Sequence, residues 1–257
     1  MAGVLRRGGH ARRGHRVFVD GSGRSDGLKK IAITGASGRV GSALAAGLAS
    51  RYRLTLMSRS IDGTDLSQLD SVAERLAGHD AVVHLAWQYV NSKRTRTLGY
   101  FGNLEMSRNV LRAARRAGVA RAVMASSVHA DYFYDWDGPG YLPPDRPPRG
   151  NDVYGSAKVL VEELGRELSD ETLRVASVRY GAVTRDGLPH PSDAWERRVW
   201  LSHGDLCALL IRIIEAEDPP ISSLLTAVSD NEGRVHDTAN PFGWVPRDRA
   251  EALTPSG

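Results

Sequence analysis

The sequence predicts an α/β fold, in which a doubly wound parallel sheet is covered by helices on both faces. Three observations lead to this prediction. From residue 31 onward, short and nearly continuous apolar runs alternate with segments of helical periodicity, the pattern of strands that are buried on both sides. A glycine-rich turn follows the first apolar run. The chain has 257 residues, enough for one domain of this kind with a large core.

Basic residues are concentrated at the beginning of the chain. Residues 1–30 contain eight Lys or Arg and two Asp or Glu, whereas the whole chain has a net charge of only +4. The remaining part is therefore slightly acidic, which argues against a nucleic-acid-binding domain. Residues 1–28 are expected to be a disordered basic tail, because a segment rich in Arg, Gly and Ser cannot bury enough apolar surface to fold. A single domain is expected over 29–257.

The first part of this domain predicts three strands and two helices. The apolar, β-branched run at 31–33 is the first strand, and the alanine- and leucine-rich segment at 42–50 is the first helix. Apolar residues gather again at 53–57 and at 81–85, which are expected to be the second and third strands. Between them, 69–77 has the spacing of a short amphipathic helix.

The second part continues the alternation of helix and strand. Apolar residues recur at helical spacing over 104–117, and a strand is expected at 121–125. A helix at 152–168 and a strand at 173–178 follow. The apolar segment 205–214 is expected to be a helix that is either buried or packed against a second copy of the chain.

The glycine-rich turn at 34–41 reads Thr-Gly-Ala-Ser-Gly-Arg-Val-Gly. A strand, such a turn and a helix together direct backbone N–H groups and a helix N-terminus toward a pyrophosphate. The alternative is a strand–helix connection that merely requires small residues. The context favours a Rossmann-type nucleotide-binding domain. Its cofactor contacts are expected at Gly35, Ser37, Gly38, Arg39, Val40 and Gly41.

Candidate catalytic residues follow the fourth strand. Tyr154 and Lys158 lie four residues apart on the helix expected at 152–168, so the ammonium lies near the phenol. A phenol has an ordinary pKa near 10 and needs a cationic neighbour to exchange protons at neutral pH. Ser127, which follows strand 121–125, could polarise a carbonyl. These groups suit proton transfer coupled to hydride transfer.

A second Tyr-x-x-x-Lys match, Tyr89 to Lys93, lacks a helical pattern and an upstream serine, so we interpret it as a coincidence within a loop. The histidines have no carboxylate or cysteine at ligand spacing, and no metal site is expected.

These motifs resemble the extended short-chain dehydrogenase/reductase superfamily, which includes the NAD-dependent epimerases and dehydratases. The resemblance covers about residues 29–250. It places Ser127, Tyr154 and Lys158 on the catalytic positions, with Lys158 also binding the nicotinamide ribose. It further implies a role for Asn103 in supporting a proton-relay water. The remaining cofactor contacts that it implies are at Asp65, Leu66, Leu85 and Ala86.

Within that superfamily the chain is similar to the uronate dehydrogenases, which oxidise a free hexuronic acid at C1. The similar stretches are 125–129, 178–181, 200–205, 228–231 and 243–251.

The likeness implies that Arg179 binds a substrate carboxylate and that His129 hydrogen-bonds a sugar hydroxyl. Substrate-binding elements are expected in 128–151 and in a small C-terminal part, 180–257. Two departures are Val128, where those enzymes have Asn, and an aromatic segment, Trp87-Gln88-Tyr89, in place of a small polar residue.

Cofactor preference is predicted from the end of the second strand. A carboxylate there favours NAD, whereas a basic residue accommodates the 2′-phosphate of NADP. The strand is followed by Ser58 and Arg59, without a carboxylate, and Arg39 adds a second positive charge. The sequence therefore predicts NADP or NAD as cofactor, with NADP preferred.

The predicted function is an NAD(P)-dependent oxidoreductase that acts on a hydroxyl or carbonyl of a small sugar, a sugar acid or a related compound. The alternatives are a nucleotide-sugar epimerase or dehydratase, a reductase of small carbonyl compounds, and a non-catalytic NADP sensor. No apolar run approaches the ~20 residues of a membrane span. The single cysteine, Cys207, suits a reducing cytoplasm. A homodimer is possible.

Overall fold

The computed structural model describes residues 27–89, 96–134 and 136–253. The predicted tail at 1–28 lies almost wholly outside the described residues, as does Lys93. A parallel sheet of six strands has the order β2-β1-β3-β4-β5-β6. The strands are β1 (Lys30–Thr34), β2 (Arg53–Met57), β3 (Ala81–His84), β4 (Arg121–Ser127), β5 (Arg174–Tyr180) and β6 (Ser222–Ala227).

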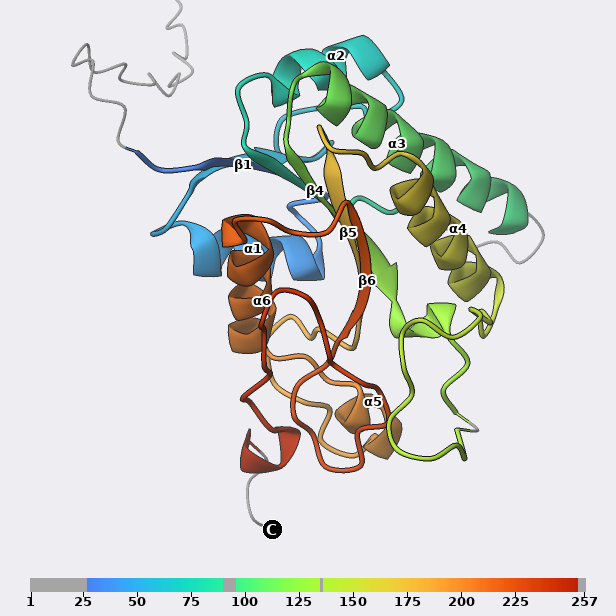
Figure 1. The fold of residues 1–257 in the computed structure, drawn as a ribbon. Helices are drawn as coiled ribbons and strands as arrows, with labels where there is room; N and C mark the ends of the chain where they lie inside the picture. Colours follow the sequence, from blue (N-terminus) through green and yellow to red (C-terminus); the bar gives the residue numbers. More distant parts are fainter. Residues whose placement is uncertain (1–26, 90–95, 135, 254–257) are drawn as a thin grey trace, which may run out of the picture.

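Helices cover both faces of the sheet, so the predicted doubly wound α/β class is confirmed (Figure 1). One face carries α1 and α6, and the other carries α2, α3 and α4. The helices are α1 (Arg39–Leu48), α2 (Leu69–Leu76), α3 (Arg96–Arg116), α4 (Val153–Glu167), α5 (Ala194–Arg198) and α6 (His203–Glu215), with short 3-10 helices η1 (Val128–Ala130) and η2 (Ala250–Leu253).

The apolar segment that forms α6 is buried within its own chain. Leu206, Leu209 and Ile213 are at most 1% exposed and belong to the same core cluster as Leu44 and Leu48 of α1. Of the two placements predicted for this helix, the structure therefore shows the buried one.

The sequence-based prediction misses α5 and β6, and it makes α3 and β4 too short. The five-residue α5 is too short to show helical periodicity, and β6 is an edge strand that begins with half-buried Ser222 and Ser223. The helix expected at 104–117 begins earlier, at Arg96. Strand β4 continues to Ser127, so this serine is the last residue of the strand.

Chain order reverses between β1 and β3, which lie side by side while β2 lies beyond β1. Parallel sheets bind ligands at such a switch point, beyond the carboxyl ends of the strands. Three long segments follow β4, β5 and β6 and gather below the sheet in Figure 1. An isolated bridge joins Leu142 of the first segment to His236 of the third, and the N–H of Ser229 in the third donates to the carbonyl oxygen of Trp200 in the second at 2.9 Å. These segments therefore form one substructure.

Within the described part of the chain, no helix combines the length and the apolar character that crossing a membrane requires.

Candidate active site

A cleft of about 960 Å³ extends along the carboxyl edge of the sheet, from the end of β2 to the first turn of α4. Its walls come from the loops after β1, β2, β3 and β4, together with α4. Every residue predicted to contact the cofactor lies on this wall: Gly35, Ser37, Gly38, Arg39, Val40, Gly41, Ser58, Arg59, Asp65, Leu66, Leu85, Ala86, Tyr154 and Lys158. Ser127 and His129 lie there too.

The glycine turn has the geometry that a pyrophosphate requires. Gly35 has φ +69°, and a Cβ there would lie 2.6 Å from the backbone nitrogen of Ala86. A Cβ on Gly41 would lie 2.5 Å from the carbonyl oxygen of Gly35, so α1 packs directly on the turn. Gly38 caps α1 without a side-chain hydrogen bond. The N–H groups of this helix terminus are thus left for an anionic ligand, and the site fits a dinucleotide.

At the other end of the cleft, α4 positions Tyr154. Asp152 caps this helix, because its Oδ1 accepts a hydrogen bond from the backbone of Gly155 at 2.8 Å. Tyr154 is thereby held in the first turn, next to the carboxyl end of β4. Burial raises the pKa of the Tyr154 phenol, while a hydrogen bond with Ser127 lowers it. The serine and the tyrosine predicted to act together therefore meet in the structure.

Lys158 lies one turn further along α4 and is 5% exposed. Its Nζ donates a hydrogen bond to the carbonyl oxygen of Ala125 at 2.8 Å. The same atom lies 3.7 Å from the centroid of the Trp87 ring and 5.7 Å from that of the Tyr154 ring. Burial lowers the pKa of Lys158 to about 7, and the nearby carboxylate of Glu162 opposes this shift.

Aromatic rings surround the Tyr154 phenol. Trp87 lies edge-on at 5.6 Å between centroids, Tyr89 stacks at 6.2 Å, and His129 lies edge-on at 5.9 Å. Trp87 and Tyr89 belong to the aromatic segment after β3 that departs from the family pattern. Its composition was visible in the sequence, but its packing on Tyr154 was not predicted. The rings therefore limit the access of water to Tyr154 and Lys158, and charge interactions between such groups are strong.

Replacing Trp87 by Leu is expected to move the acid limb of the kcat/KM profile for alcohol oxidation to higher pH, by about half to one unit. The indole face favours the charged ammonium of Lys158, by about 0.5–2 kcal/mol, and one pKa unit corresponds to about 1.4 kcal/mol. Without the ring the ammonium is less favoured. The phenolate of Tyr154 then loses positive charge beside it and forms only at higher pH. The measurement is the pH dependence of cofactor reduction.

Two further variants accompany this experiment. Trp87→Phe retains an aromatic face and should shift the profile less than Trp87→Leu does. Trp136, which lies 5.4 Å from the guanidinium of Arg146 and outside the cleft, is a matched control. Trp136→Leu should leave the profile in place. A uniform loss of kcat in Trp87→Leu, with no shift in pH, would mean that the ring only packs.

Asn103, predicted to support a proton-relay water, binds the backbone of the segment after β3. Its Oδ1 accepts from the backbone N–H of Gln88 at 2.7 Å, and its Nδ2 donates to the carbonyl oxygen of Gln88 at 2.9 Å. The residue is 1% exposed and is not part of the cleft wall. Asn103 therefore fixes the backbone between Trp87 and Tyr89, and through it their rings beside Tyr154.

Arg179, predicted to bind a substrate carboxylate, binds other residues of the protein and does not line the cleft. Its Nε and Nη2 both bind the carboxylate of Glu162 at 2.8 Å, and its Nη1 donates to the carbonyl oxygen of Pro144 at 3.2 Å. Asp131 lies 3.6 Å away. Arg179 is 1% exposed and lines neither this cleft nor the pocket beside it. Its fork is occupied by a protein carboxylate and is not available for one on a substrate.

A second pocket of about 320 Å³ opens from the cleft. The two share Ser127 and His129 as wall residues, so the pocket begins at the end of the cleft that holds Tyr154. Burial lowers the pKa of His129, which favours the neutral form of its imidazole. The rest of the pocket wall includes Phe133, Tyr134, Asp193, Trp195 and Glu196.

The wall residues contributed by α5 were missed by sequence reasoning. Asp193 caps this helix, because its Oδ1 accepts from the N–H groups of Trp195 and Glu196. The spacing Asp193-x-x-Glu196 is the capping-box signal that could have revealed the helix.

The end of β2 forms the opposite end of the cleft. Arg59 and Asp65 line it, and the N–H and hydroxyl of Ser67 lower the pKa of the Asp65 carboxylate. Asp62 is turned away from the cleft and binds Thr64 and Arg75.

Comparison with known proteins is consistent with this geometry. The family model for the NAD dependent epimerase/dehydratase family matches residues 31–199. The chain is 32% identical to an L-arabinose 1-dehydrogenase (NAD(P)(+)) of Haloferax volcanii, over 88% of this chain and 99% of that protein. It is 30% identical to a uronate dehydrogenase of Agrobacterium fabrum, over 88% and 87%. The crystal structure of the uronate dehydrogenase from Agrobacterium tumefaciens superimposes with a TM-score of 0.73 at 28% identity, covering 87% of this chain and 86% of that one.

Proposed function

Because this chain belongs to the NAD-dependent epimerase/dehydratase family, we propose that it is an NAD(P)-dependent dehydrogenase acting on a hydroxyl group of a small sugar or sugar acid. The observation that carries the proposal is the meeting of Tyr154, Ser127 and Lys158 at one end of the long cleft. A proton-transfer group beside a dinucleotide site is what hydride transfer to and from a hydroxyl carbon requires.

The residues present fit a bound dinucleotide. Gly35, Gly38 and Gly41 with the N-terminus of α1 would hold its pyrophosphate. Leu85 and Ala86 would lie between this turn and the nicotinamide, and Lys158 would hold the nicotinamide ribose. When bound, the nicotinamide supplies a hydride acceptor or donor.

The protein's own residues carry the proton. The Ser127 hydroxyl holds the reacting oxygen of the substrate next to the Tyr154 phenol. Tyr154 accepts the hydroxyl proton during oxidation and returns it during reduction. The Lys158 ammonium offsets the cost of a buried phenolate. The ring of Trp87 and the backbone fixed by Asn103 exclude water from this proton transfer.

The size of the second pocket favours a small substrate. At about 320 Å³ it lies at the lower end of the range for small-molecule sites. That size suits a monosaccharide better than a nucleotide sugar. A dehydrogenase of free sugars is therefore favoured over a nucleotide-sugar epimerase or dehydratase.

The test is a screen of cofactor reduction by the purified protein with free aldoses and free uronic acids, using NAD and NADP in parallel. Cofactor-dependent turnover of at least one of these compounds supports the proposal. Tight cofactor binding without turnover of any of them, or of carbonyl compounds in the reverse direction, would instead favour a cofactor sensor.

We further propose that NADP is preferred over NAD, on the evidence of the charges at the end of β2. Arg59 lines the cleft and forms no direct ion pair among the residues that the structure describes. Its charge contributes, after the hydrogen bonds from Ser67, to lowering the pKa of the neighbouring Asp65 carboxylate. The nearby carboxylate of Asp62 binds Arg75 and is turned away from the cleft. Arg39 lines the cleft as well.

Replacing Arg59 by Ala is expected to lower kcat/KM for NADP about tenfold or more and to change that for NAD less than about threefold. A charge-assisted hydrogen bond to the 2′-phosphate contributes about 1.5–3 kcal/mol, and NAD lacks this group. Arg185, exposed and outside the cleft, serves as a control, since Arg185→Ala should change neither value. A strong preference of the unaltered enzyme for NAD would contradict the proposal.

A further inference from the structure

The second pocket presents aromatic rings to its contents. Phe133 stacks on Tyr134 with 4.3 Å between ring centroids, and Trp195 lies edge-on to Tyr134 at 5.5 Å. Tyr134 and Trp195 are 39% and 42% exposed, although both are large and partly apolar. Tyr134 and Trp195 contact each other and still line the pocket with part of each ring exposed. Such a surface suits the flat, C–H-bearing face of a sugar ring.

The charged groups of the pocket are mainly negative. Asp193 uses one carboxylate oxygen to cap α5. Glu196 is half-buried, and its carboxylate has no hydrogen-bond or ion-pair partner among the described residues. A carboxylate only accepts hydrogen bonds. Both side chains can therefore bind the hydroxyl groups of a sugar, and both repel an anion.

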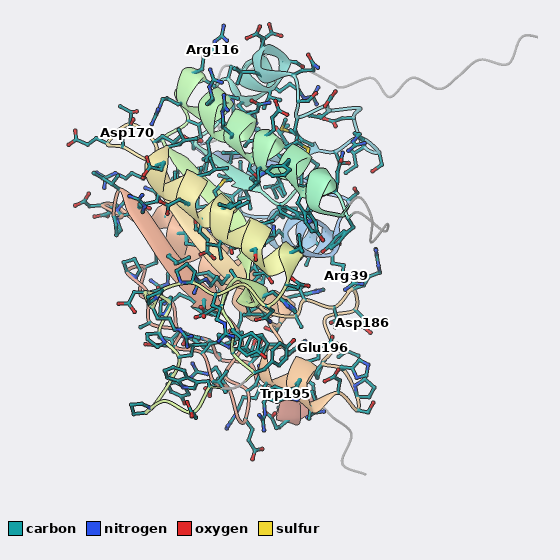
Figure 2. The ribbon with its side chains drawn as sticks, turned by 90° about the vertical axis from the view of Figure 1, so that its right-hand side faces the viewer. Arg39, Arg116, Asp170, Asp186, Trp195 and Glu196 are labelled. Atoms are coloured by element: carbon teal, nitrogen blue, oxygen red, sulfur yellow. The ribbon has the colours of Figure 1, made fainter. Side chains whose placement is uncertain are left out.

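Basic residues near the pocket are otherwise engaged. Arg39 is the basic side chain on the described wall of the pocket, and it is shared with the cleft, beside the glycine turn. The phosphate groups of a bound dinucleotide would therefore offset its charge. Arg198 stacks on the Trp195 ring at 4.8 Å and is not part of the wall. Figure 2 shows Arg39 on the same side of the molecule as Trp195 and Glu196.

From this arrangement we propose that the second pocket selects an uncharged aldose and discriminates against a sugar acid. The sugar ring packs on Tyr134 and Trp195, its hydroxyls donate to Glu196 and Asp193, and His129 contacts a hydroxyl near the reacting carbon. Arg179, which the family likeness assigns to a substrate carboxylate, is held by Glu162. The inference rests on the proposed dehydrogenase function and specifies its substrate class.

The deciding experiment compares sugars that differ only at C6, where an aldose has a hydroxymethyl group and the corresponding uronate a carboxylate. The pairs are D-glucose with D-glucuronate and D-galactose with D-galacturonate. We expect kcat/KM to be at least tenfold higher for the aldose of the better pair. Equal or faster turnover of the uronate overturns the inference and leaves the dehydrogenase function intact. If neither pair is turned over, turnover of another free aldose in the screen with no uronate accepted supports the inference, whereas absence of turnover with every aldose and uronate overturns the inference and the dehydrogenase function together.

Variants then test which side chains discriminate. Glu196→Gln keeps the shape of the side chain and removes its charge. It should lower the ratio of kcat/KM for the aldose to that for the uronate about three- to tenfold, because the uronate is turned over better. Glu217→Gln, at an exposed carboxylate outside the pocket, is the matched control and should leave the ratio unchanged. If Glu196→Gln and Glu217→Gln had the same aldose-to-uronate ratio of kcat/KM, the proposed role of Glu196 would be wrong.

Trp195→Ala should raise KM for the aldose about tenfold without changing the cofactor Kd, and Trp195→Phe should restore most of the loss. If Trp195→Ala retained the original KM for the aldose, the proposal that the sugar ring packs on Trp195 would be wrong.

Discussion

Replacing Tyr154 by Phe is expected to lower kcat by about a thousandfold or more while leaving the Kd of the cofactor within about threefold of its original value. Proton transfer by a positioned group contributes about 10²–10⁴ to rate, and phenylalanine removes that group while keeping the ring. The ring retains its packing on Trp87 and His129. Steady-state kinetics and a direct binding titration measure the two quantities.

Tyr89→Phe is the matched control, because Tyr89 is a second phenol stacked on Tyr154 and lining the same cleft. Burial and the neighbouring Tyr89 both raise the pKa of Tyr154. Loss of the Tyr89 hydroxyl leaves the Tyr154 phenol in place, so kcat should change less than about tenfold. If Tyr154→Phe retained turnover, the dehydrogenase mechanism proposed here would be wrong. If only the Tyr89 variant lost activity, the roles of the two tyrosines would have to be exchanged.

Much of the fold and of the cofactor cleft follows from local sequence. The glycine turn lies between an apolar run and an amphipathic helix, and its conformation depends on the steric freedom of Gly35 and Gly41, which a single chain segment reveals. Tyr154 and Lys158 share a helix face because they are four residues apart. Both predictions need only the geometry of one strand or one helix. Parallel strands then bring their carboxyl ends to one edge without further information.

The rest depends on contacts between segments far apart in the chain. Asn103 binds the backbone of Gln88. The sequence alone does not show whether an amide side chain faces water or another loop. Trp195 belongs to a helix of five residues, too short for periodicity to identify. Arg179 lies in β5, and its partner Glu162 lies in α4, the helix that precedes this strand. A family resemblance predicts the role of Arg179 from its position in the sequence. The charged group that lies opposite Arg179 depends on the tertiary structure.

Replacing Arg179 by Met is therefore expected to lower the free energy of unfolding by about 3–5 kcal/mol, the cost of leaving a buried partner charge uncompensated. The Arg179 and Glu162 side chains are 1% and 8% exposed, and the pair has bidentate geometry. Chemical denaturation measures the loss. Arg174→Met, in the same strand but paired with a largely exposed Asp218, should cost about 1 kcal/mol or less.

The double variant Arg179→Met with Glu162→Met separates a structural pair from a substrate ligand. Removing both charges leaves neither partner of the pair unpaired in the core, and buried Asp131 keeps its contact with Arg146 at 3.4 Å. The double variant should therefore be more stable than the sum of the two single losses predicts. A residue that bound substrate would behave differently. Its loss would raise KM for a carboxylate substrate and leave the unfolding transition nearly unchanged, with no energetic coupling to Glu162. Because Arg179 binds Glu162 through two nitrogens inside the protein, we expect strong coupling in the free energy of unfolding, so that its charge serves the packing of α4 on β5.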